Sequence, residues 1–366
     1  MGGGLMQLVA YGAQDIYLTG NPQITFFKVV YRRHTNFSME SIEQTFNGTV
    51  GPSARLTATV SRNGDLVHKM YLASTTGTAV TKANYGHFEL ISEVELEIGG
   101  QRIDKQTAQW METWAQLTEV NPLGTVATAS DGMASGTIFQ KMSGAGGVDA
   151  TSATHGLIHV PLQFWFCRNA GLALPLIALQ YHEVKVILTC GALSGDSNLQ
   201  LWADYIYLDT DERRRFAQVS HEYLIEQVQE ESVANNSSEK TLNFNHPVKE
   251  LVISAHTLGA LSAPFTPGTN VGLKLNGHDR FAARDPKYIT RAQIWHHHTG
   301  HPVVDDSVGV YSFALKPEEH QPSGTCNFSR IDNAVLSADF HACVIYAVNY
   351  NVLRIMSGMG GLAYSN

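Results

Sequence analysis

The sequence predicts an all-β fold of two tandem β-sandwiches, with short helices confined to the loops. Short runs of alternating apolar and polar residues, rich in Val, Ile, Phe and Tyr, recur along the chain, which is typical of half-buried strands. Gly, Asn and Pro mark turns between these runs. The same order of strands and turns begins again after a charged segment near residue 210, so we expect two domains of one kind.

Composition limits the classes of function. The 366 residues are 43% hydrophobic and 16% charged, which supports a buried core and argues against disorder. The net charge of −8 disfavours direct binding of nucleic acid, since that would need a basic face. No apolar run reaches the roughly 18 residues that span a bilayer, and the N-terminus lacks the basic start and apolar stretch of a secretory signal. We therefore expect a protein made and kept in the cytosol.

The first domain follows a glycine-rich arm. Residues 1–22 end at Asn21-Pro22 and predict an arm ahead of the fold. Residues 23–209 predict the first sandwich, of the jelly-roll type, because they contain about eight strand-like runs. These runs lie at 24–31, 43–50, 55–61, 66–73, 91–103, 157–165, 183–190 and 202–208.

Three stretches of this domain depart from the strand pattern. Aromatic and apolar residues at helical spacing predict an amphipathic helix over 106–118, at the edge of a sheet. Residues 171–181, rich in Leu and Ala, predict a second short helix that Pro175 starts or kinks. Residues 120–155 between them have few large apolar side chains and predict an exposed loop.

A short charged segment separates the two halves and predicts a linker over 210–218, ahead of a second sandwich over 219–366. Its acidic residues precede its three arginines, an order that favours a short helix, because the helix dipole favours carboxylates at the start and guanidinium groups at the end. Acids within one turn of the arginines favour pairing within the chain, or a subunit contact, over phosphate binding. The candidate site residues belong to this segment: Asp209, Asp211, Glu212, Arg213, Arg214, Arg215 and Phe216.

The second half repeats patterns of the first. Residues 94–103 and 271–281 are both alternating strands that meet a Gly turn and then an Arg. Residues 160–166 and 310–315 are both strands followed by a long polar or Pro-marked segment that another strand rejoins. Repeats of this length predict a duplicated domain. Three such chains around a threefold axis would present six similar domains, a pseudo-hexagon suited to tiling a surface.

The strongest candidate for metal chemistry is a cluster near residue 300: His296, His297, His298, His301, Asp305 and Asp306. Imidazole and carboxylate groups bind metals, and a jelly roll can hold a catalytic metal in its barrel. Adjacent residues on a strand face opposite sides, so the three consecutive histidines converge on one ion only if the segment is a loop. A jelly-roll metalloenzyme using His296, His298 and His301 is the alternative function, and a solvated or subunit-contact cluster is favoured over it.

Other signatures of catalysis are missing from the sequence. It has no Gly-x-Ser-x-Gly elbow, no Gly-x-x-x-x-Gly-Lys-Ser/Thr loop and no Gly-x-Gly-x-x-Gly after a strand. The glycine-rich residues 358–361 predict a flexible tail, and the four cysteines lack the Cys-x-x-Cys spacing of a zinc site. We expect no catalytic residue, no metal and no cofactor. A carbohydrate-binding sandwich, which would be a monomer with an exposed aromatic platform, is a third alternative.

Several long blocks carry a family resemblance, which spans the chain from residue 5 to residue 354. They are the linker and residues 22–37 (PQITFFKVVYRRHTNF), 161–169 (PLQFWFCRN), 174–184 (LPLIALQYHEV), 275–281 (LNGHDRF) and 311–333. In these blocks the chain resembles the double jelly-roll major capsid protein of nucleocytoplasmic large DNA viruses of eukaryotes. The resemblance implies a homotrimeric capsomer of an icosahedral shell, each subunit holding two eight-stranded sandwiches.

The resemblance also implies partners and a location. In that family the N-terminal arm lies at the inner base of the shell, near minor capsid proteins and the lipid layer, and long loops form the outer towers. The implied partners are the chain itself, minor capsid and penton proteins, and an inner membrane near the arm, with no direct contact to nucleic acid. The implied location is the virion capsid, assembled in the host cytoplasm. The chain is short for the family, most visibly in its second half.

Overall fold

The structure is a computed structural model that describes residues 3–74, 79–80, 85–120, 136–147, 153–154, 158–193, 198–257 and 260–364. It consists of two compact units, Met1–Asn36 and Phe37–Asn366. The first unit is an N-terminal arm, and the second contains all the β-sheets. No helix within the described ranges is both long enough and apolar enough to cross a membrane.

The arm has little secondary structure. Its helices are α1 (Gly3–Val9) and α2 (Ile16–Thr19), and neither buries a residue. Residues 24–31, where the sequence predicts the first strand, are exposed coil, so that prediction is wrong and the arm extends to Asn36. The physical reason is that β-branched and aromatic residues form a strand only against a neighbouring strand, and the described arm contains none.

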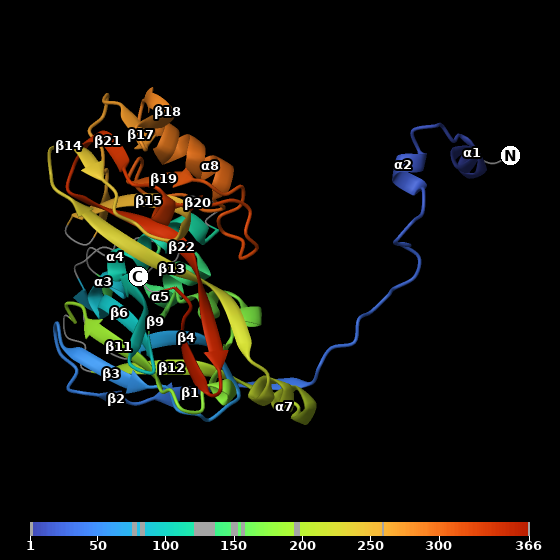
Figure 1. Cartoon of the computed structure of the whole chain (residues 1–366), viewed down its shortest axis with the longest axis horizontal. Coiled ribbons are helices and arrows are strands. Elements are labelled where there is room, and N and C mark those ends of the chain that lie inside the picture. The colour runs from blue at the N-terminus through green and yellow to red at the C-terminus, as the bar shows by residue number, and fades with distance from the viewer. Residues whose placement is uncertain are drawn as a thin grey trace. The chain divides into compact units, whose positions relative to one another are not determined.

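The first sandwich consists of two five-stranded antiparallel sheets (Figure 1). One sheet has the order β1 (Phe37–Gln44), β12 (Leu199–Leu208), β4 (Leu66–Ser74) and β10 (Leu174–Pro175), with β9 (Ile158–Pro161) also paired to β4. The facing sheet has the order β2 (Phe46–Asn47), β3 (Arg55–Thr59), β11 (Val184–Cys190), β6 (Ile91–Ile98) and β7 (Gln101–Thr107). The short strands β5 (Ala79–Val80) and β8 (Ala153–Thr154) pair separately.

The second sandwich has a seven-stranded sheet and a four-stranded sheet. The larger sheet has the order β13 (His221–Val233), β22 (Cys343–Met356), β15 (Pro247–Thr257) and β16 (Ala260–Ser262), and its side strands are β19 (Val308–Ser312), β20 (Cys326–Asn327) and β23 (Met359–Leu362). The facing sheet has the order β14 (Ser237–Thr241), β21 (Ala334–Phe340), β17 (Val271–Leu275) and β18 (His278–Arg284). Figure 1 shows this sandwich, in yellow to red, stacked on the first, in blue to green.

The two sandwiches share one strand order, as the repeated sequence pattern predicts. In each, the first long strand lies at an edge beside the last one, β1 beside β12 and β13 beside β22. The next strand inward, β4 or β15, also pairs with short strands, which are β9 and β10 in the first sandwich and β16, β19 and β20 in the second. Each facing sheet ends in a hairpin, β6–β7 or β17–β18. The observed topology is therefore the duplicated jelly roll that the sequence predicts.

The edge hairpins use the same kind of turn in both halves. Two residues connect the strands in each case, Gly99 and Gly100 in one hairpin and Asn276 and Gly277 in the other. Their φ angles are 58° and 85° in the first turn and 49° and 82° in the second. Positive φ at both central residues gives the turn whose twist matches the flanking strands, which explains the choice of glycine and asparagine.

Short helices connect the strands. They are α3 (Tyr85–Leu90), α4 (Ala108–Thr118), α5 (Ile138–Ser143), α6 (Trp165–Arg168), α7 (Thr210–Gln218) and α8 (Gln293–His297), with the π-helical turn η4 (Tyr288–Ala292) and the 3-10 turns η2 (Ala170–Leu172), η3 (Leu176–Ala178) and η5 (Phe328–Arg330).

Helix α4 is the helix predicted over 106–118, but its surroundings differ from the prediction. Every residue from Ala108 to Leu117 is buried, whereas one apolar face at a sheet edge was expected. The helix packs between the two sandwiches, where Gln109 Nε2 donates to the carbonyl of Ser254 at 2.9 Å. The second sandwich covers the helix face that a lone sandwich would leave in water.

Two loop predictions also need correction. Residues 171–181 form 3-10 turns and the short strand β10 rather than a helix, because Pro175 lacks an N–H and restricts the residue before it. The described part of 120–155 includes α5, whose start carries a capping box between Thr137 and Gln140, with Gln140 buried. It also includes β8, and residues 121–135, 148–152 and 155 of that predicted loop lie outside the described ranges.

The hydrophobic core is continuous across both sandwiches in the described residues. The larger cluster joins Leu96 and Trp110 of the first sandwich to Val252 and Tyr346 of the second. A second cluster, which includes Phe340, fills the interior of the second sandwich. Because the sandwiches share buried apolar surface, residues 37–366 form one compact unit.

Candidate functional site

The predicted linker residues form helix α7 and its N-terminal cap, directly after β12. The side chain of Asp209 caps this helix by accepting from the backbone N–H of Thr210 at 2.8 Å. Asp211 and Glu212 lie in the first turn, near the positive end of the helix dipole. Glu212 pairs with Arg215 at 3.3 Å, one turn along the helix. The local acid-before-base order therefore explains why this segment is helical.

Two further linker residues hold α7 on the first sandwich. Arg213 Nε lies 3.0 Å from Asp65 Oδ1, and the Asp65 side chain is 7% exposed. Phe216 packs against a small buried cluster and its ring stacks on His221 at a centroid distance of 5.2 Å. Arg214 has no hydrogen bond or ion pair with any described residue. The structure thus brings two of the three arginines to carboxylates of the same chain.

A larger set of polar contacts joins the sandwiches along a surface that we call the seam. The seam is the contact of α4, β7 and α6 with β13, β15, β22 and the loop over 298–303. Across it, Thr113 Oγ1 lies 3.1 Å from Ser254 Oγ, and Asp104 Oδ1 accepts from the backbone N–H of Val228 at 3.2 Å. Burial raises the pKa of Asp104 to about 7, although its hydrogen bonds act in the opposite direction. The seam therefore buries polar groups that need partners from the other sandwich.

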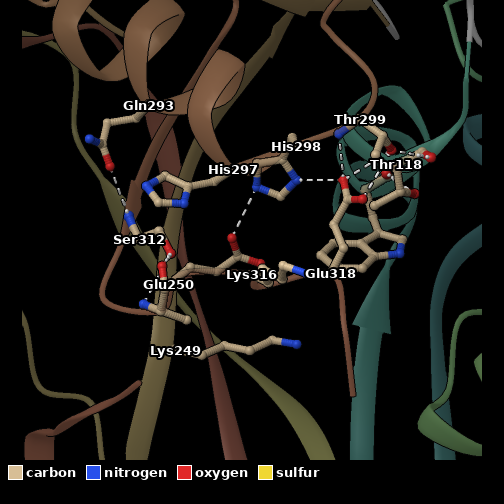
Figure 2. A network of polar contacts seen from close by, with 12 residues as sticks. Thr118, Lys249, Glu250, Gln293, His297, His298, Thr299, Ser312, Lys316 and Glu318 are labelled. Carbon is tan, nitrogen blue, oxygen red and sulfur yellow. Dashed lines mark hydrogen bonds and ion pairs between the residues drawn. The ribbon is translucent and has the colours of Figure 1, made fainter. Parts of the chain in front are cut away.

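His298 is the centre of one polar network in the seam (Figure 2). Its Nε2 lies 3.0 Å from Glu250 Oε2 and its Nδ1 lies 3.0 Å from Glu318 Oε1. The side chains of His298 and Glu250 are 0% exposed. Burial lowers the pKa of His298, but the charges and hydrogen bonds of the two carboxylates outweigh it and raise the pKa to about 9. The ring is therefore an imidazolium at neutral pH, and both of its nitrogens donate.

This network reaches the first sandwich through Trp114 and through the residues after His298. The Trp114 ring on α4 lies edge-on to the imidazole at 6.4 Å. Thr299 Oγ1 donates to the carbonyl of Thr118 at 3.2 Å, and the N–H of Gly300 donates to the carbonyl of Leu117 at 2.8 Å. A Cβ on Gly300 would lie 2.5 Å from a backbone oxygen of α4, so this close approach requires glycine.

A second network in the seam is centred on Glu226 of β13. Its Oε2 lies 3.1 Å from Arg168 Nη1 of the first sandwich, and its Oε1 lies 2.8 Å from Lys249 Nζ, whose side chain is 0% exposed. Burial favours the neutral form of Glu226, but His320, Lys249 and Arg168 lower its pKa to about 2. The Arg168 guanidinium also lies over the Trp114 ring at 4.3 Å. Buried charges are tolerated here because each has a partner.

The C-terminal hairpin β22–β23 contacts the first sandwich as well. The N–H of Tyr181 donates to the carbonyl of Gly358 at 2.9 Å, and His182 Nδ1 lies 2.9 Å from the carbonyl oxygen of Gly360. A Cβ on Gly360 would lie 2.6 Å from Leu179 Cδ2. The prediction of a flexible tail over 358–361 is therefore wrong, because these glycines permit a close backbone contact.

The histidine cluster does not converge on one point. His298 is buried and both of its ring nitrogens are paired with carboxylates, whereas His296 and His301 are exposed. His297 Nδ1 lies 3.2 Å from the carbonyl oxygen of Leu315, and Figure 2 shows its ring apart from the contacts of His298. Asp306 is paired with Arg291 at 2.6 Å. Among the described residues, no group of three or more His, Cys, Asp or Glu is arranged to hold a metal ion.

Sequence reasoning missed the seam residues. The available signal was the pair Lys249 and Glu250, two adjacent charges followed directly by the apolar run Leu251–Ile253 in strand β15. Charged side chains are almost never fully buried without a partner, so such a pair in a central strand indicates polar contacts from another element. The partners are Glu226 of β13 and His298 after α8, which only the folding of the second sandwich brings beside β15, so no local pattern identifies them.

Comparisons with known proteins agree with this architecture. Residues 25–209 match the family described as major capsid protein N-terminus, and residues 259–361 match that of the large eukaryotic DNA virus major capsid protein. The major capsid protein of Pyramimonas orientalis virus is 54% identical over 407 aligned residues, and that of Paramecium bursaria Chlorella virus 1 is 42% identical over 452, each match covering 100% of both chains.

Solved structures show the same fold. A chain of the PBCV-1 virus capsid superposes with a TM-score of 0.78 at 38% identity, covering 93% of this chain and 100% of that one. The Faustovirus major capsid protein shares the fold at 13% identity, with a TM-score of 0.65 and 94% of each chain covered. With its two equivalent jelly rolls and these matches, the chain belongs to the major capsid proteins of large eukaryotic DNA viruses.

Proposed function

We propose that this chain forms homotrimers that act as pseudo-hexagonal capsomers and tile an icosahedral virion shell. The observation that carries the proposal is the pair of topologically equivalent sandwiches joined into one compact unit. Three copies around a threefold axis present six similar sandwiches, which is a tile with near-sixfold edges. A duplicated chain reaches this shape with half the subunits that single sandwiches would need.

The seam supports the proposal because a tile needs a fixed angle between its two sandwiches. Charged side chains from both sandwiches meet in the seam, as Arg168 and Glu226 do, and the apolar core continues through it. If the sandwiches separated, the buried Glu226 would lose its ion pair with Arg168, and the buried Asp104 would lose the hydrogen bond from the N–H of Val228. Neighbouring tiles then meet a rigid edge rather than two independently moving domains.

We propose that the chain consists of an arm, two jelly rolls and a linker between the jelly rolls. The first jelly roll ends at residue 209, residues 210–218 link it to the second, and the arm precedes both. The linker helix lies in the chain path from β12 to β13, so its anchoring by Arg213 and Phe216 limits the freedom of that connection.

The arm is the part of the chain best suited to further partners. Its first 31 residues hold more exposed large apolar side chains than all other described residues together. We propose that the apolar helices α1 and α2 contact minor capsid proteins, penton proteins or the surface of an inner membrane, since an apolar helix lowers its free energy by leaving water. The chain's net charge of −8 leaves no role for direct genome binding in this proposal.

The proposed work of the chain is structural rather than catalytic, and its proposed site of assembly is the host cytoplasm. The four cysteines are free, and three of them are buried. A fold that needs no disulfide is suited to a reducing compartment.

Native mass spectrometry of the purified full-length protein tests the proposal. A trimer of three times 40.1 kDa is expected, since obligate interfaces of this class commonly bury more than about 2,000 Å². Negative-stain images of the same sample should show particles with six similar lobes. A protein that stays monomeric at every concentration tested would contradict the proposal.

A further inference from the structure

The first sheet ends at an open edge. Strand β1 pairs with β12, and no other described strand pairs with it. Its residues from Phe37 to Ser41 are exposed, and the apolar side chains of Phe37 and Met39 are 53% and 49% exposed. An edge strand of this kind presents free N–H and C=O groups that can accept another strand.

The arm contains a strand-forming segment without a sheet. Residues 24–31 (ITFFKVVY) are β-branched and aromatic apart from Lys28, yet they are coil. Phe26, Phe27 and Val29 are 85%, 97% and 90% exposed. An exposed apolar segment with high strand propensity aggregates unless a partner covers it. Such a partner needs a surface of matching shape and charge.

The charges of the two segments are complementary. The charged residues of 22–36 are all basic: Lys28, Arg32 and Arg33. The charged residues of β1 are both acidic: Glu40 and Glu43. Asp204 of β12 lies directly opposite Ser41 of β1 and adds a third carboxylate beside the open edge. Electrostatic attraction of this kind guides partner choice and association rate.

A pocket of about 810 Å³ lies next to this edge. Tyr71 links the two, because its hydroxyl lies 3.0 Å from Ser41 Oγ and its ring packs on His159 at 5.4 Å. Tyr71, His159 and Trp114 all line the pocket. Its charged groups that form no ion pair with a described residue are two acids and one base, Glu119, Asp204 and Lys69. Aromatic walls of this size accommodate a phenylalanine ring.

We infer that residues 24–31 of one copy add as a strand to β1 of a neighbouring copy and place a phenylalanine in the pocket beside it. Main-chain hydrogen bonds extend the sheet, and alternate side chains give specificity. Phe26 and Phe27 point to opposite sides of a strand, so only one of them reaches the pocket. The inference rests on the proposed assembly of identical copies, which places an arm near every open edge.

A second copy fits this edge better than the subunit's own arm. Folding back onto β1 would require a tight hairpin loop within residues 32–36, and that loop (RRHTN) has no glycine and begins with two adjacent arginines. Hairpin loops of three to five residues usually contain glycine at a positive φ. A strand supplied by another chain has no such restriction.

Disulfide trapping between differently tagged chains tests the inference. Full-length Phe27→Cys with one tag is co-expressed with full-length Met39→Cys carrying another, and the complex is mildly oxidised. A covalent product that joins the two tags is expected, because a disulfide needs Cα atoms within about 7 Å. When each position of 24–31 is replaced by cysteine in turn and paired with Met39→Cys, the yield of covalent product should peak at one position and decrease on both sides of it. The native cysteines are free, and only Cys326 is not buried, so the unsubstituted protein provides the blank.

Two matched pairs serve as controls. Phe27→Cys with Met359→Cys probes a methionine of β23 that is 52% exposed, close to the 49% of Met39. Tyr17→Cys with Met39→Cys probes an arm residue that is 89% exposed but lies in α2. The yield of cross-tag product from the test pair should be about tenfold higher than from either control pair. This yield should fall as the salt concentration rises, since screening weakens contacts between exposed charges.

Each outcome is decisive. If trimers form but the test pair gives no more cross-tag product than the controls, the inference is wrong and the proposed function stands. If the double variant Phe27→Cys/Met39→Cys loses both thiols within one chain, the arm folds onto its own edge and the inference is again wrong. If native mass spectrometry shows only monomers, the proposed function itself fails.

Discussion

Replacing His298 by leucine is the most informative perturbation of the seam. The residue is the hydrogen-bond partner of Glu250 Oε2, while Glu250 Oε1 has no hydrogen bond to any described residue. The carboxylate is fully buried, so the leucine variant leaves it without its counter-charge. Removing one member of a buried pair lowers the free energy of unfolding by about 3–5 kcal/mol.

This loss converts into a measurable change of melting temperature. Unfolding entropy of about 2.1 cal/mol/K per residue, taken over the roughly 330 residues of the second unit, predicts a fall in Tm of about 4–7 °C. Scanning calorimetry measures Tm, and tryptophan fluorescence follows the same transition through Trp114 beside the imidazole. His296→Leu is the matched control, because His296 is exposed and should change Tm by less than about 1 °C.

A double variant and a pH series distinguish the contribution of the His298 charge to stability from the contribution of its packing. His298→Leu/Glu250→Leu should recover most of the loss, because an apolar pair of similar volume replaces a buried ion pair with little cost. The pKa of His298 is raised from 6.5 to about 9, so its stabilisation is complete below about pH 6.5 and is lost as pH rises through about 9. The difference in Tm between wild type and His298→Leu should shrink over this window. A difference that stays constant up to about pH 10, or a Tm equal to that of His296→Leu, would refute the reasoning.

Two further substitutions test the other parts of the seam. Glu226→Gln leaves the buried Lys249 without its counter-charge and should lower the free energy of unfolding by about 3–5 kcal/mol in urea titrations. Because the pKa of Glu226 is lowered from 4.5 to about 2, its stabilisation is present above about pH 4.5 and is lost as pH falls through 2, so acid titration should show this variant losing less stability than wild type. Gly360→Ala should lower the free energy of unfolding by about 1–3 kcal/mol, because the new Cβ lies 2.6 Å from Leu179. Gly51→Ala, whose Cβ meets nothing within 4 Å, should leave the urea midpoint unchanged.

Local patterns in the sequence predict most strands of the first sandwich and the duplication. Alternation and turn residues place strands near β3, β4, β6, β11 and β12, and the two-residue turns at Gly99 and Asn276 follow from their glycine and asparagine composition. Acid before base predicts the linker helix α7, with Asp209 at its cap. These features depend on residues close together in the chain, so their physical causes are visible in the sequence.

The errors share a different cause, which is contact with a distant element. Residues 24–31 have strand propensity but no neighbouring strand, so propensity alone predicts the wrong state. Helix α4 looks amphipathic because the sequence does not show that a second sandwich covers its polar face. The glycines at 358–361 look like a tail, although Gly360 is needed where the backbone meets Leu179. His298 looks like a metal ligand because its carboxylate partners lie far away in sequence.

The central claim is that two fused jelly rolls act as one rigid tile that functions through its flanks. Electron cryomicroscopy of the assembled protein tests it most directly, since the map shows both the number of sandwiches in each particle and the contact between them. We predict three chains around a threefold axis, six sandwich-shaped densities, and continuous density through the seam at Trp114 and His298. Single chains, or particles in which the two sandwiches take variable orientations, would contradict the account.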